Sequence, residues 1–156
     1  MPARSARSTL EKFFRKYPPA IAATGRAAVT KMQRILPGWT AMVYDNYNAL
    51  VVGFSPTDRP SDAICSLALY PRWVNLFFLQ GAFLKDPHRI LRGSGKWVRG
   101  VRLESAADLD RPEIRALIAE ARADSPRPMT RSAGGPLVIR SVSAKQRPRR
   151  PRRSPA

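Results

Sequence analysis

The stretch "AICSLALYPRWVNLFFL", residues 63–79, decides the fold. It holds two apolar runs, residues 63–70 and 73–79, that are rich in strand-forming side chains and separated only by Pro71 and Arg72. A connection this short joins antiparallel strands, because parallel neighbours need a crossover of a dozen or more residues. The stretch therefore predicts an antiparallel β-hairpin at the centre of the chain.

Further strands are predicted on both sides of this hairpin. Residues 41–47 and 49–54 have a period of two and predict a second hairpin, although the connection near Asn48 lacks the Asn-Gly pair that would set its register. Residues 96–103 predict a fifth strand, and residues 137–143 have the pattern of a short edge strand. We therefore expect a sheet of about five antiparallel strands.

Helical periodicity precedes the strands. Within residues 8–17, apolar side chains recur at i, i+3, i+4 and i+7, and Ser8 and Glu11 have the spacing of a capping box. The Pro-Pro pair at 18–19 is placed to open a second amphipathic helix, which the Pro-Gly pair at 37–38 ends. Two N-terminal helices are the expectation.

A third helix is predicted after the strands. Asp110 and Glu113 repeat the capping-box spacing, Pro112 falls in the first turn, and an apolar stripe continues to Ala121. Each helix has one apolar stripe and each strand mostly one apolar parity. We therefore predict an α+β fold in which the N-terminal and C-terminal helices pack on one face of the antiparallel sheet.

The charge of the chain is unevenly distributed. The 156 residues carry a net charge of +17, and residues 126–156 contribute nine of the 28 Lys and Arg residues and none of the 11 Asp and Glu residues. Pro and Arg alternate in "RPRRPRR" at 147–153. We interpret residues 8–124 as one domain and residues 125–156 as a disordered Pro/Arg-rich basic tail, because such a composition buries too little apolar surface to offset its ordering entropy.

Other features bear on compartment and cofactors. A single cysteine, Cys65, excludes an internal disulfide and suits a reducing, cytoplasmic setting. The apolar stretch at 73–84 is broken by polar residues and too short for a membrane span. His88, the only histidine, follows Asp86 in a "DPH" that is typical of a turn rather than a metal site. We expect no metal and no cofactor, and the oligomeric state is left open.

The stretch "GSGKWVRG" at 93–100 is the one glycine-rich candidate for a ligand site. It is not a P-loop, because Ile90 stands where the first glycine belongs and Trp97 replaces the Ser or Thr that binds magnesium. It also leads into a predicted strand instead of a helix. Two interpretations follow: a plain turn, or an anion pocket. The pocket residues are Gly93, Ser94, Gly95, Lys96 and Arg99.

The direction of the Arg99 side chain decides between these two interpretations. It shares its strand parity with Trp97, so if Trp97 faces the core, the Arg99 guanidinium points inward and needs an anion. That anion is either an internal carboxylate or a bound ligand. The candidate carboxylates are Asp45, Asp62 and Glu104.

Several stretches in this order resemble the YdhG-like family of small bacterial domains of unknown function, over about residues 8–124. They are "ILPGW" (35–39), "VYDNYNALVVGF" (43–54), "ALYPRWVNLFFLQGAFL" (68–84), "LRGSGKWVRGVRL" (91–103) and "PEIRALIAEA" (112–121). The resemblance implies a compact α+β domain similar to frataxin. Because one branch of the family is described as an iron chaperone, it also implies an iron-binding role.

The residues favour binding over catalysis. Cys65 has no second thiol, His88 has no clear acid-base partner beyond Asp86, and no serine lies in a nucleophile elbow. We expect a non-catalytic binding or accessory protein that holds a small anionic ligand through Lys96 and Arg99.

One alternative is a protein that binds nucleic acid non-specifically through its basic tail, and a second is a frataxin-like iron chaperone. The candidate nucleic-acid-binding residues are Arg147, Arg149, Arg150, Arg152 and Arg153. Trp39, Trp73 and Trp97 are either core residues or stacking platforms for bases.

Overall fold

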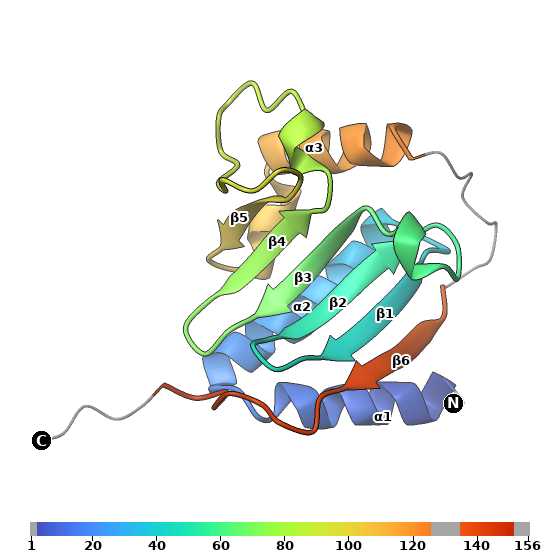
Figure 1. The fold of residues 1–156 in the computed structure, drawn as a ribbon, viewed down its shortest axis with the longest axis vertical. Helices are drawn as coiled ribbons and strands as arrows, with labels where there is room; N and C mark the ends of the chain where they lie inside the picture. Colours follow the sequence, from blue (N-terminus) through green and yellow to red (C-terminus); the bar gives the residue numbers. More distant parts are fainter. Residues whose placement is uncertain (1–2, 126–134, 152–156) are drawn as a thin grey trace, which may run out of the picture.

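The computed structural model describes residues 3–125 and 135–151. In this part of the chain, one six-stranded sheet has the strand order β5-β4-β3-β2-β1-β6, and three α-helices lie behind one of its faces (Figure 1). The fold is α+β, as predicted. The elements are α1 (Ala3–Phe14), α2 (Pro19–Ile35), β1 (Thr40–Asp45), β2 (Leu50–Ser55), β3 (Cys65–Leu69), β4 (Val74–Phe78), β5 (Arg99–Leu103), α3 (Pro112–Ala123) and β6 (Leu137–Val142), with short 3-10 turns at Pro60–Asp62, Gly81–Phe83 and Ala106–Asp110.

The hairpin predicted in the opening stretch is confirmed. β3 and β4 pair antiparallel with Leu69 opposite Val74, and the Tyr70 N–H donates to the Trp73 carbonyl across the turn at 2.9 Å. All of β3 is buried, whereas β4, which is next to the edge strand β5, alternates between buried and half-buried positions. This difference in burial explains why the first apolar run is continuous and the second contains Asn75.

The hairpin of β1 and β2 is also confirmed, and its register is now defined. Asp45 lies opposite Leu50, and the Asn46 N–H donates to the Ala49 carbonyl at 2.9 Å. The connection is therefore the four residues 46–49. Because this connection and the Tyr70–Trp73 turn leave the sheet at the same end, the two turns lie next to each other.

The first two helices pack as their periodicity predicts, but α1 begins earlier than expected. The predicted apolar face is buried, whereas Ser8 lies inside the helix and is not its cap. α1 packs against β6, and Ala6, one turn before Leu10, is fully buried there. The extra N-terminal turn is thus stabilised by tertiary packing on a strand that is remote in sequence. α2 begins at Pro19, as expected.

The predicted cap of α3 is wrong. Arg111 is the residue before the helix, and the Asp110 carboxylate instead accepts hydrogen bonds from Lys31 and from Arg115, the latter at 3.0 Å. A capping box does occur nearby, formed by Ser105 and Asp108 at the start of the preceding 3-10 turn. That extra turn moves the start of α3 and frees Asp110 to pair with α2.

The most consequential difference from the sequence interpretation concerns residues 125–156. β6 confirms the short edge strand predicted at 137–143, but it pairs parallel with β1, so the sheet is mixed and not entirely antiparallel as expected. The domain therefore continues beyond residue 124, and the prediction of a disordered tail is wrong for residues 137–151. The physical reason is the open edge of β1, whose amides and carbonyls gain partners, as when the Ala41 N–H donates to the Pro136 carbonyl. Within the described ranges, no helix is long and apolar enough to cross a membrane.

Candidate nucleic-acid interface

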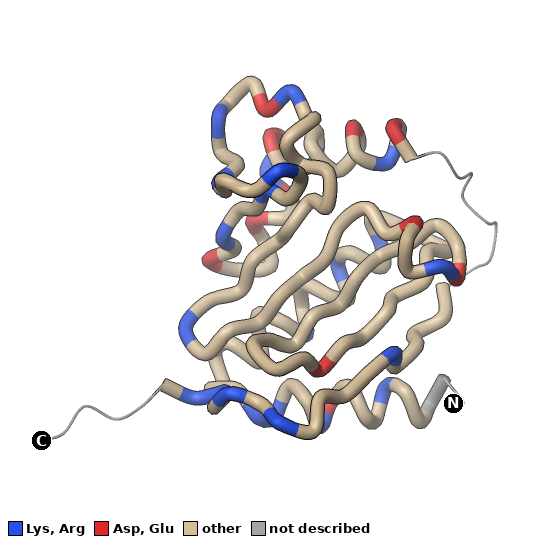
Figure 2. The backbone as a smooth tube through the Cα atoms, in the orientation of Figure 1, with Lys and Arg blue, Asp and Glu red and all other residues tan. Residues whose placement is uncertain are grey.

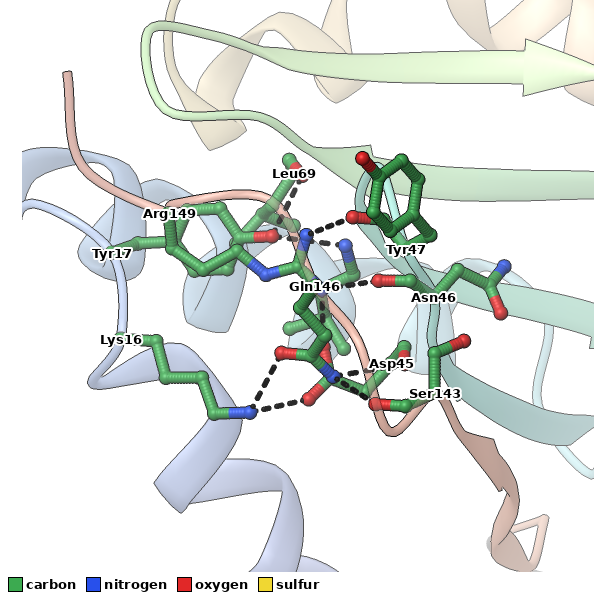
Figure 3. Close-up of polar contacts among 10 residues, drawn as sticks. Lys16, Tyr17, Asp45, Asn46, Tyr47, Leu69, Ser143, Gln146 and Arg149 are labelled. Carbon is green, nitrogen blue, oxygen red and sulfur yellow. Dashed lines mark hydrogen bonds and ion pairs between the residues drawn. The ribbon is translucent and has the colours of Figure 1, made fainter. Parts of the chain in front are cut away.

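A buried carboxylate at the end of β1 holds the C-terminal segment, residues 143–151, against the domain. Asp45 is completely buried, and its two carboxylate oxygens accept from Lys16 Nζ at 2.6 Å and from an Arg149 guanidinium nitrogen at 2.8 Å. The Arg149 side chain is 4% exposed. Figure 3 shows the two cations approaching Asp45 from the turn that follows α1 and from the C-terminal segment. One carboxylate thus joins three parts of the chain.

Gln146 completes this network. Its amide donates to the backbone carbonyls of Asp45 and Ser143, at 3.1 and 3.2 Å, and accepts from Lys16 Nζ at 3.1 Å (Figure 3). Burial alone would raise the pKa of Asp45, but the hydrogen bonds from Lys16, Gln146 and Arg149 outweigh it, so the pKa lies below its ordinary value. Asp45 is therefore ionised at neutral pH and attracts both cations.

Tyr17 fastens the neighbouring turns to the same network. Its hydroxyl donates to the Leu69 carbonyl and accepts from the Leu50 N–H, both at 2.9 Å, and the Arg149 guanidinium lies 5.7 Å from its ring centre. Burial raises the pKa of Tyr17 to about 12, so the hydroxyl stays protonated and can donate. The ends of β2 and β3 and the buried arginine are thereby held in fixed positions.

An open groove of about 710 Å³ lies where the C-terminal segment passes these turns. We call it the arginine groove. Its walls come from the β1–β2 turn, the β3–β4 turn and the C-terminal segment. The lining residues are Asn48, Tyr70, Pro71, Arg72, Trp73, Arg147, Pro148, Arg150 and Pro151.

The arginine groove combines positive charge with aromatic rings. Arg72, Arg147 and Arg150 are exposed, and none of the nine described lining residues is acidic. In Figure 2 the basic positions of the C-terminal segment and of the β3–β4 turn gather at this end of the sheet. The rings of Tyr70 and Trp73 pack with their centres 5.9 Å apart.

Two further arginine-aromatic contacts flank the arginine groove. The Arg102 guanidinium lies 4.6 Å from the Trp73 ring centre, and the Arg147 guanidinium lies 5.7 Å from that of Tyr47, which is 44% exposed. Guanidinium groups bind phosphate oxygens through paired N–H donors, and aromatic rings stack on bases. This combination of groups suits a phosphate-bearing aromatic ligand.

The structure separates the five C-terminal arginines predicted to bind nucleic acid. Arg147 and Arg150 line the arginine groove, whereas Arg149 is buried on Asp45 and also donates to the carbonyls of Asn46 and Tyr47. Arg149 therefore positions the segment and presents no donor to a ligand at the surface. Arg152 and Arg153 lie outside the described residues.

The glycine turn predicted to bind an anion lies elsewhere and is differently built. Arg99 pairs with Phe78, at the opposite end of β4 from the β3–β4 turn. Its guanidinium donates to the carbonyls of Gly95 and Val98, at 2.6 and 2.8 Å, so its described partners are backbone carbonyls and not one of the candidate carboxylates Asp45, Asp62 and Glu104. Gly93, Ser94, Gly95 and Lys96 are all exposed.

The predicted anion site assumed that Trp97 faces the core, and this assumption is wrong. The strand begins at Arg99, so residues 96–98 do not follow its alternation, and Trp97 is 52% exposed against the ring of Phe83. Trp39, by contrast, is a core residue, and Trp73 alone of the three tryptophans lines the arginine groove.

The other side chains considered for chemistry, those of Cys65 and of the "DPH" sequence, lie in surroundings that fit a structural role. Burial raises the pKa of the Cys65 thiol to about 12, which keeps it protonated at neutral pH. The Asp86 carboxylate accepts from the N–H groups of Ile90 and Leu91, both at 3.0 Å, so the "DPH" sequence forms the expected turn. Among the residues with described positions, no group of three or more His, Cys, Asp or Glu side chains is arranged to hold a metal ion.

Sequence reasoning missed most of the arginine groove. Its local signal is "YPRW" at 70–73, an arginine between two aromatic residues in a two-residue connection. The contacts of Asp45 had no local signal, because Lys16 and Arg149 lie 29 and 104 positions away. Comparisons with family models, with curated proteins and with solved structures find no match to this chain.

Proposed function

We propose that this protein is a non-catalytic binding protein whose ligand is a nucleic acid, held through its phosphates in the arginine groove. The observation that carries the proposal is the convergence of Arg72, Arg147 and Arg150 on one open groove from two segments far apart in sequence. The buried contact between Arg149 and Asp45 holds one of those segments in place. A preordered segment loses less conformational entropy when it binds a ligand.

A phosphate polymer suits the charge pattern better than a single small anion does. Three separate guanidinium groups along an open groove can each pair with a different phosphate, and each pairing releases a counterion. The net charge of +17 adds a long-range attraction that accelerates encounter with a polyanion. The affinity should therefore fall steeply as the salt concentration rises.

The other two candidate functions stay predictions. A small anion at the glycine turn would have to compete with the carbonyls that Arg99 already contacts, and Lys96 is exposed beside it. The iron-chaperone role rests on the resemblance to the YdhG-like family. We favour nucleic acid because the arginine groove presents guanidinium groups without an adjacent carboxylate among its described residues.

The test is fluorescence polarisation of a labelled oligodeoxynucleotide across a range of salt concentrations. The variant Arg147→Gln/Arg150→Gln removes two arginines of the groove, and the control Arg34→Gln/Arg140→Gln removes two exposed arginines outside it, so both lose the same net charge. We expect the groove variant to reduce the slope of log affinity against log salt by about 1.4 to 1.8, or two phosphate contacts. Equal losses in both variants would contradict the proposal, because they would show a diffuse effect of net charge.

A further inference from the structure

Aromatic rings stand beside the guanidinium groups in the arginine groove. Tyr70 and Trp73 are both partly exposed there, and their rings are inclined at 40° to each other. The hydrogen bond between their backbone groups fixes the turn that carries them. A site for phosphate alone gains nothing from rings, since phosphate is recognised by charge and N–H donors.

The rings are held by stacked cations. The Arg102 guanidinium lies over the Trp73 ring and the Arg147 guanidinium over the Tyr47 ring, and cation–π contacts of this kind restrict the rings. Nucleic-acid bases stack on aromatic side chains and on guanidinium planes in the same manner. A bound base can therefore stack on these ring–guanidinium pairs.

Three of the remaining lining residues of the arginine groove are prolines, which are stiff and apolar. Pro71, Pro148 and Pro151 have restricted backbone angles and no N–H to present to a ligand. Their side chains add apolar surface to the groove that also contains the two aromatic rings. The groove is open and has a volume of about 710 Å³, which leaves room for an organic group beside the rings.

We infer that the arginine groove binds unpaired bases together with their phosphates, so that the protein prefers single-stranded to duplex nucleic acid. In a duplex each base is stacked between its neighbours and its flat faces are covered, whereas an unpaired base can turn toward Trp73. This inference rests on the proposed function and adds the state of the strand that the protein selects.

The test compares three probes: a single-stranded oligodeoxynucleotide, the duplex of the same sequence, and inorganic polyphosphate, which has charge but no bases. The full-length chain is used, with Trp73→Leu, which removes the aromatic face, and Trp73→Phe, which keeps one. We expect the wild type to bind the single strand about tenfold more tightly than the other probes. The preference should disappear in Trp73→Leu and persist in Trp73→Phe.

Tryptophan fluorescence supplies an independent readout. A base stacked on Trp73 should quench the emission of the wild type, and the quenching should be absent in Trp73→Phe, where Trp39 and Trp97 still emit. Thermal melting of both variants confirms that they are folded. If Trp73→Leu fails to fold, Trp73→Phe with Tyr70→Leu tests the same ring surface by the affinity comparison.

The outcomes distinguish the inference from the proposed function. Equal affinity for duplex and single strand, or quenching that persists in Trp73→Phe, would overturn the preference for unpaired bases while leaving phosphate binding intact. Loss of binding to all three probes on Trp73→Leu in a folded protein would also overturn it. If the wild type bound none of the probes, the proposed function itself would be refuted.

Discussion

Replacing Asp45 by Asn should destabilise the protein strongly, because it leaves Arg149 charged and buried. Lys16, which is 39% exposed, can turn to water when its partner loses charge, but Arg149 is almost completely enclosed. Removing one partner of a buried ion pair costs about 3 to 5 kcal/mol. In a chain of this length we expect the Tm to fall by about 10 °C.

The assay is urea unfolding at neutral pH, with Glu11→Gln as the matched control. Glu11 pairs with Arg26, and both side chains are more than a third exposed, so removing that pair should cost less than about 1 kcal/mol. The Asp45→Asn variant should also bind oligonucleotide more weakly, because Arg149 no longer holds residues 143–151 in place. A linked loss of stability and binding is the expected pattern.

The pH dependence gives a second measurement of the same contact. The pKa of Asp45 is lower in the folded protein than the value of about 3.9 in an unfolded chain. Its contribution to the free energy of unfolding is therefore complete above about pH 4 and is lost as the pH falls through the folded-state pKa. In Asp45→Asn this part of the acid dependence should be absent.

A small effect of Asp45→Asn on the free energy of unfolding would refute this reasoning. If Asp45→Asn and Glu11→Gln lowered the free energy of unfolding equally, Arg149 would not be confined in a buried position. The C-terminal segment would then be only loosely attached, and the arginine groove would lose its preordered wall.

Three further outcomes are expected. Deleting residues 126–156 should destabilise the protein strongly in urea unfolding, because it removes β6 and Arg149, whereas a detached tail could be lost without effect. Gly135→Ala should lower the Tm, since an added Cβ would lie 1.6 Å from the Trp39 carbonyl oxygen, while Gly95→Ala, with open space around it, should leave the Tm unchanged. Cys65 should react with a thiol reagent only after unfolding, because it is fully buried and its pKa is raised to about 12; rapid labelling of the native protein would contradict this.

Elements that depend on local alternation were predictable from the sequence. The β3–β4 hairpin follows from two apolar runs around Pro71 and Arg72, and α2 follows from the Pro-Pro pair that precedes it. In these elements the neighbours that decide the structure are close in sequence. The α+β class follows from the order of the elements.

Predictions failed where a remote partner decided the structure. Ser8 does not cap α1, because packing against the remote strand β6 extends that helix. The prediction for Trp97 failed for a local reason, since the strand begins only at Arg99. The Pro/Arg-rich composition predicted a disordered tail. This prediction failed because composition does not reveal that β1 has an open edge and a buried carboxylate beside it.

The sequence by itself determined the fold class, the central hairpins and the excess of positive charge near the C-terminus. Only the tertiary structure decided how that charge is used: Arg149 is buried on Asp45, whereas Arg147 and Arg150 line a groove with Tyr70 and Trp73. The physical reason is the range of the interactions. Periodicity and turn chemistry act between near neighbours, whereas an ion pair joins residues 104 positions apart only after the sheet has brought them together.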